Sequence, residues 1–149
     1  MHRTDIDSDR LRPFEIRVLE MLLDGDHPVL AVLREQLSAC YVVDRYWSGV
    51  GFFTTLRVTD DAPLAPPKTP PISDVWGEIS GIEHGVGYVV FLEGGQLSLL
   101  EGFSFVSPWD GEDDVVRLYY DDPSRAGTFA ELDAAAFLPD TNGSSARVE

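Results

Sequence analysis

The sequence has one cysteine, one lysine and no long apolar run. The single cysteine, Cys40, excludes an internal disulfide framework and a multi-cysteine zinc site, and its apolar neighbours indicate a buried structural thiol. No apolar segment approaches the roughly 18 residues that cross a bilayer. The charged first residues lack the apolar core of a signal peptide. We therefore expect a cytoplasmic protein that makes no use of a membrane.

Positive charge is also scarce. The 149 residues include 11 Lys and Arg against 26 Asp and Glu, which gives a net charge of −15. A chain this acidic repels phosphates, so nucleic acid is not an expected partner. The acidic residues are densest at 110–122, a stretch that includes Asp110, Asp113 and Asp114. Such a surface speeds association with a basic protein, although acidic runs also serve solubility alone or reflect the composition of a GC-rich genome.

The chain length fits one folded domain with flexible ends. Apolar residues make up 44% of the chain, which is enough for a packed core. We expect residues 1–11 to form a mobile arm, 12–122 to form a single domain, and 123–149 to form a partly disordered tail.

Two amphipathic helices are expected before Cys40, joined by a short link into a helical hairpin. Apolar residues recur at helical spacing in both segments. Pro13 fits the first position of the first helix, and Asp26 fits the N-cap of the second. Glu15 falls outside the apolar stripe of the first helix, on its other faces.

From residue 41 onward the hydrophobic period becomes that of strands. Gly94 and Gly95 form the clearest hairpin turn. The strand before them, at 86–93, is apolar enough to lie at the centre of a sheet, covered on both faces. Five prolines at 60–71 indicate a loop, and only 129–138 suggest a further, short helix. The expected strands are 41–47, 50–58, 75–82, 86–93, 96–105 and 115–120.

Two helices followed by strands that are mostly joined by hairpins are typical of an α+β protein. We predict an N-terminal helical hairpin packed on a meander-like antiparallel sheet of about six strands. Apart from a short C-terminal turn, helices should be confined to residues before Cys40.

The usual catalytic, metal and cofactor motifs are incomplete. The aspartates at 5, 7 and 9 have the initial spacing of a calcium loop, but Arg10 and Ile16 stand where its glycine and its bidentate glutamate belong. The Gly-Val-Gly at 85–87 precedes a strand, so a phosphate would find no helix N-terminus there. We therefore expect no metal, no cofactor and no complete catalytic set.

Glu101 is the most informative single position. On a regular strand it shares one face with Leu97, Leu99, Phe103 and Phe105, which would bury a carboxylate among apolar side chains. Such a group shifts its pKa or finds a partner. It is either a functional acid/base or ligand-anchoring carboxylate, or one that pairs with an arginine, or one that a β-bulge near 99–100 turns outward.

Trp109 and Tyr119 are the aromatic residues that we expect at the surface. Trp109 lies in a loop beside Pro108, and Tyr119 and Tyr120 cannot both face the core. Because Trp and Tyr are favoured at interfaces, they are candidate binding residues. The alternative is that they cover an open edge of the sheet.

Three segments resemble a group of small bacterial proteins that have no established activity. Gly49–Thr54 is similar to a Gly-x-Gly-Phe-Phe-Thr-like strand of that group, and 84–105 with Pro108 and Trp109 is similar to its ending. Phenylalanines stand at 103 and 105 where the group has tyrosines. The resemblance spans about residues 12–120 and implies the same fold, with Glu101 as part of a motif.

Three functions fit these observations. The leading hypothesis is a non-catalytic binding protein, like an immunity protein or an antitoxin, that neutralises a basic protein. The second is a small enzyme or ligand-binding domain with Glu101 and His84 in one pocket, although two residues define no reaction class. The third is a homo-oligomer, such as a dimer, that pairs its sheet edge with a second copy.

Overall fold

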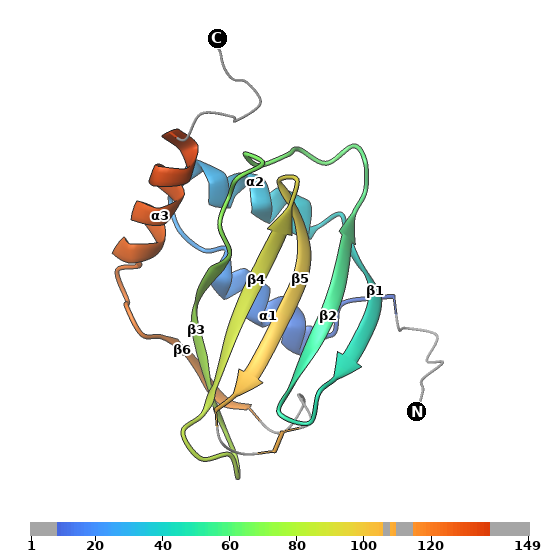
Figure 1. Cartoon of the computed structure of the whole chain (residues 1–149), viewed down its shortest axis with the longest axis vertical. Coiled ribbons are helices and arrows are strands. Elements are labelled where there is room, and N and C mark those ends of the chain that lie inside the picture. Colours follow the sequence, from blue (N-terminus) through green and yellow to red (C-terminus); the bar gives the residue numbers. More distant parts are fainter. Residues whose placement is uncertain (1–8, 106–107, 110–114, 138–149) are drawn as a thin grey trace.

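The computed structural model describes residues 9–105, 108–109 and 115–137, which form an α+β architecture (Figure 1). Two helices come first, six strands follow, and a third helix ends the described chain. The helices are α1 (Pro13–Leu22), α2 (Pro28–Leu37) and α3 (Ala126–Phe137). The expected fold class, with two N-terminal helices on an antiparallel sheet of six strands, is confirmed.

All six strands join one antiparallel sheet in the order β1-β2-β5-β4-β3-β6. β3, β4 and β5 follow one another as hairpins, whereas the loop after β2 carries the chain across the sheet to β3. Gly94 and Gly95 form the predicted turn between β4 and β5, with φ angles of 58° and 80° that the favoured two-residue hairpin turn requires. The strands are β1 (Cys40–Trp47), β2 (Gly51–Val58), β3 (Ile72–Ile79), β4 (Val86–Glu93), β5 (Gln96–Ser104) and β6 (Val115–Tyr120).

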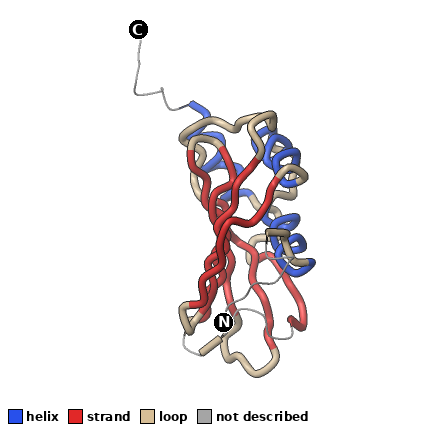
Figure 2. Tube along the Cα trace, turned by 90° about the vertical axis from the view of Figure 1, so that its right-hand side faces the viewer, coloured by secondary structure: helices blue, strands red, loops and turns tan. Residues whose placement is uncertain are grey.

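The two N-terminal helices cover only one face of the sheet. α1 contacts β3 and β4, α2 contacts β5, and Figure 2 shows both helices on the same side. Val90 and Leu100 are fully buried beneath them. β4 lies between β5 and β3, as predicted for a central strand. The expectation that it is covered on both faces is wrong, because no described element packs over Val89 and Phe91, which stay half-buried.

Polar side chains fix the position of α2. His27, not Asp26, is its N-cap, and His27 Nδ1 accepts a hydrogen bond from the amide of Val29 at 3.2 Å. The proline that follows it takes the first helical position, which places the cap one residue later than predicted. At the other end, Gln36 is fully buried and its amide nitrogen donates to the Gly95 carbonyl at 2.8 Å. α2 is therefore tied to the β4–β5 turn.

α3 is longer than the short C-terminal turn that the sequence suggests. It runs for 12 residues and packs on the link between α1 and α2. Leu132 is buried, His27 Nε2 lies 2.6 Å from Asp133 Oδ1, and Arg125 Nη2 donates to the Leu22 carbonyl at 2.6 Å. These partners are more than 100 residues apart in the sequence, so long-range contacts hold this helix in the fold.

Candidate functional site

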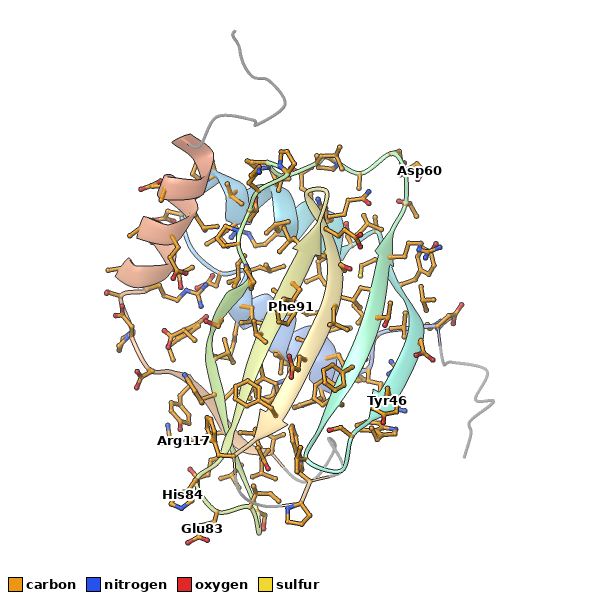
Figure 3. The ribbon with its side chains drawn as sticks, viewed as in Figure 1. Tyr46, Asp60, Glu83, His84, Phe91 and Arg117 are labelled. Atoms are coloured by element: carbon orange, nitrogen blue, oxygen red, sulfur yellow. The ribbon has the colours of Figure 1, made fainter. Side chains whose placement is uncertain are left out.

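The face of the sheet that is turned away from α1 and α2 carries mostly apolar side chains. Successive residues of a strand point to opposite faces, so the neighbours of the buried core residues point to this side. Figure 3 looks onto it, with Phe91 near the middle of the sheet and Tyr46 on the edge strand β1. We call this surface the open face. Its residues are Phe53, Trp76, Val89, Phe91, Leu99, Glu101, Phe103 and Phe105.

Glu101 lies on the open face because β5 contains a bulge. A register shift between β4 and β5 leaves Ser98 without a residue opposite it. The extra residue changes the alternation, so that Leu97 and Leu100 are both buried on the helix side and Glu101 points away from the helices. Of the three expectations for this carboxylate, the structure shows the outward-turning bulge, one residue earlier than predicted.

The surroundings of the Glu101 carboxylate are apolar. Glu101 lies directly opposite Phe53 of β2 on one side and Val89 of β4 on the other. Such opposite residues have Cβ atoms about 4.5–5.5 Å apart. Burial raises the pKa of Glu101 above that of a free glutamate. Within the described part of the chain, no side chain donates a hydrogen bond or an ion pair to it.

Three aromatic rings form a cluster next to Glu101. The rings of Phe103 and Phe105 meet edge to face at 5.3 Å, and Trp76 stacks on Phe105 at 5.9 Å. Gly87 makes room for them, because a Cβ atom there would lie 2.6 Å from the Phe103 ring and 2.9 Å from the Trp76 ring. Phe105 is 56% exposed. The cluster is thus a partly exposed aromatic surface beside a carboxylate that no described side chain pairs with.

Tyr119 extends this cluster onto β6. It pairs in register with Trp76 and is half-buried. The guanidinium of Arg117 lies 4.3 Å from the centre of its ring, and the same arginine bonds Glu78 at 3.0 Å. Tyr119 is therefore a surface aromatic residue, as expected, at the border of the open face.

His84 lies far from Glu101. It occupies the turn between β3 and β4, at the end of the sheet (Figure 3). β4 begins at Val86, three residues or about 10 Å from Val89, the residue opposite Glu101, and His84 lies two residues before that start, in the turn. The described contacts of its side chain include only a 4.0 Å approach to Glu83. The structure therefore does not bring Glu101 and His84 together in one pocket, as the hypothesis of a small enzyme or ligand-binding domain requires.

The prediction that Trp109 is exposed is wrong. Its side chain is only 2% exposed, and its ring meets those of Phe52 and Tyr88 at 5.7 and 6.2 Å. The amide of Trp109 donates to the Gly49 carbonyl at 2.9 Å, which draws the loop over the core. Trp109 is a core residue of the helix side. Asp110, Asp113 and Asp114 lie outside the described residues.

Among the described residues, the buried carboxylate is that of Glu15, which falls outside the apolar stripe of α1. It is 3% exposed, and the Nη2 atom of Arg45 lies 2.7 Å from its Oε1 atom. Thr54 donates to its other oxygen at 2.8 Å, and the amide of Arg12 donates to Oε1 at 2.7 Å. Glu15 occupies the third helical position, with Pro13 as the first. An acidic residue at this position often accepts a hydrogen bond from the N-cap amide, and this was the sequence signal that could have predicted its role.

Two grooves flank the helices. One, of about 600 Å³, lies between α1, α2 and β1 and reaches Cys40. Burial raises the pKa of the Cys40 thiol to about 12, and the nearby charge of Glu15 adds to the shift. The thiol is therefore protonated near neutral pH, as expected for a structural cysteine. In the other groove, of about 520 Å³, Arg34 donates to the Leu23 carbonyl and Arg125 Nη2 donates to the Leu22 carbonyl. The Nε and Nη1 atoms of Arg125 are buried without a hydrogen-bond partner among the described residues.

Comparison with known proteins assigns no relative. No family profile matches the sequence, and neither curated proteins nor solved structures give a match. Among the described residues, no three His, Cys, Asp or Glu side chains are grouped to hold a metal ion. None of the helices in that part of the chain is long and apolar enough to cross a membrane. The open face is thus the feature on which a function can be argued.

Proposed function

We propose that this chain is a non-catalytic cytoplasmic protein that binds a basic protein through the open face, in the manner of an immunity protein or an antitoxin. The observation that carries the proposal is the apolar sheet face with, at its centre, the Glu101 carboxylate, which pairs with no side chain in the described part of the chain. Aromatic residues are typical anchors of protein interfaces. An uncovered face of this kind is a common mark of an interaction site.

The charge of the chain supports a basic partner. The net charge of −15 attracts a positively charged protein and speeds its encounter. The same charge opposes self-association, since two copies that met through their open faces would each bring a carboxylate to the contact. A hetero-complex is therefore favoured over the homodimer.

Two matched variants test the proposal. Phe105 on the open face is 56% exposed, and Leu64 in the loop after β2 is 61% exposed, so an aspartate at either position should leave the core intact. Wild type, Phe105→Asp and Leu64→Asp are immobilised, and proteins retained from an extract of the source cells are quantified and identified. We expect a basic protein to be retained by wild type and Leu64→Asp, and to be retained at least tenfold less by Phe105→Asp.

The dependence on salt provides a second readout of the same experiment. Retention by wild type should fall between low and physiological salt, because screening weakens attraction between opposite charges. Equal retention by the three proteins, or a retained protein that is acidic, would contradict the proposed function.

A further inference from the structure

We infer that the open face receives one arginine side chain of the partner, with its guanidinium on the Glu101 carboxylate and against the rings of Phe53 and Phe103. This inference rests on the proposed function and names the chemistry of its central contact. It identifies Glu101 as the residue that selects a cation.

Glu101 would lose its contact with water if a partner covered the open face. A partner that docks on Phe53, Val89 and Phe103 removes water from the carboxylate that lies between them. A carboxylate that loses water without a partner weakens binding strongly. Since no described side chain of this chain pairs with Glu101, the docking protein has to supply the compensating donor.

The donor that pairs with Glu101 also has to fit against aromatic rings. Phe53 lies directly across from Glu101, and Phe103 lies two residues further along β5 on the same face. An arginine donates two parallel hydrogen bonds to a carboxylate and stacks its planar group on aromatic rings. A lysine ammonium is a compact, strongly hydrated charge and loses more on entering an apolar surface. Arginine is therefore the side chain that satisfies both the carboxylate and the rings.

Other charged side chains lie nearer the borders of the open face. Arg117 is held by Glu78 and lies over Tyr119 at the border of the sheet. Arg57 is exposed on the same face of β2 as Phe53, but it lies four residues along the strand from Phe53 and opposite Tyr41 of β1. Glu101 is thus the charge at the centre of the open face, with apolar residues opposite it on both neighbouring strands. An anionic or purely apolar partner would leave this charge uncompensated.

The test uses a defined probe in place of the partner. The peptide Ac-Leu-Arg-Leu-NH2 is titrated into the full chain and followed by the backbone amide NMR signals. The control peptide replaces arginine with citrulline, which has nearly the same shape and no charge. We expect the arginine peptide to bind in the millimolar range and to shift the amides of residues 53, 89, 101 and 103, and the citrulline peptide to bind at least tenfold more weakly.

Variants of two carboxylates complete the test. Glu101→Gln should weaken binding of the arginine peptide at least tenfold, whereas Glu93→Gln, at the exposed end of β4, should leave it unchanged. Equal binding of both peptides, an unchanged affinity in Glu101→Gln, or shifts confined to other acidic sites would overturn the inference. If the peptide fails while Phe105→Asp still loses the partner, only the arginine contact is refuted. If both experiments fail, the proposed function falls as well.

Discussion

Two glutamates of this protein occupy opposite environments, and each has a distinct role. Glu15 is buried on the helix side and accepts hydrogen bonds from β1, from β2 and from its own N-cap. Glu101 stands half-buried on the open face with apolar residues opposite it. The first holds α1 against the sheet, and we propose that the second meets a partner.

Glu15→Ala should strongly destabilise the protein. The substitution leaves the Arg45 guanidinium and the Thr54 hydroxyl without their carboxylate in a buried site, and breaking such a pair typically costs about 3–5 kcal/mol. Glu20→Ala, an exposed change in the same helix, should stay within about 0.5 kcal/mol of wild type. Urea unfolding of both variants measures the difference, and equal stability would contradict the buried pair.

Glu101→Gln should have a small effect on stability that depends on pH. The folded pKa of Glu101 is raised, so its ionised form is less favourable in the folded than in the unfolded chain. This cost is fully present above the folded pKa and absent below the unfolded value of about 4.3. Because water screens the group, the variant should gain less than about 0.5 kcal/mol at pH 7.

The pH series also provides the outcome that would contradict this account. The gain of Glu101→Gln should vanish as the pH falls below about 4, and Glu101→Ala should likewise remain within about 0.5 kcal/mol of wild type at pH 7. A loss of several kcal/mol in either variant at pH 7 would mean that Glu101 has a structural partner.

At the scale of elements, the bulge in β5 allows Leu97 to point to the helix side and Glu101, four residues later, to the open face. Ser98 is the extra residue, so its deletion should make the strand regular and keep Glu101 on the open face. We expect the deletion to cost less than about 1 kcal/mol. Deletion of Thr55, which lies on the neighbouring strand opposite Leu99, should instead turn Leu56 and Val58 out of the core. Urea unfolding and amide NMR spectra of the two deletions test this contrast.

α3 contributes to stability although its own sequence pattern is weak. Leu132→Ala should cost about 2–5 kcal/mol, as for other fully buried leucines, because Leu132 is 1% exposed. Glu131→Ala, at an exposed position of the same helix, serves as the control. If both variants unfold at the urea concentration of wild type, α3 makes no energetic contribution to the folded unit.

The elements could be predicted where local periodicity decides them, and the site could not. Helical spacing before Cys40 and alternation after it predicted the two N-terminal helices, the six strands and the fold class, although β3 runs over Ile72–Ile79 and not over 75–82. A bulge near 99–100 was one of three expectations for Glu101, and local periodicity could not choose among them, because one unpaired residue reverses every later side chain. The burial of Glu15 and the length of α3 also depend on partners that are distant in the sequence. Tyr119 alone among the candidate aromatic residues lies at the surface as expected, since the loop of Trp109 folds back over Phe52.

At the scale of the whole molecule, the sheet has one face covered by helices and one that is open. The covered face accounts for the core, and the open face combines aromatic rings with Glu101 in a chain of net charge −15. An exposed apolar face costs solubility unless a partner or a strong net charge compensates for it. Under the proposed function, the acidity of the chain would serve two purposes, since it would keep the free protein apart from its copies and attract a basic partner.

Oxidative footprinting of the free chain tests most directly whether the open face is uncovered and available. Hydroxyl-radical oxidation of Phe103 and Phe105 is measured at several protein concentrations, with Tyr46 as the exposed reference and Phe52 as the buried one. We predict that Phe105 reacts nearly as freely as Tyr46, that Phe103 is intermediate, and that neither depends on concentration. Protection of both residues to the level of Phe52 at every concentration would contradict the account, and protection that appears only as concentration rises would assign the face to a second copy of the chain.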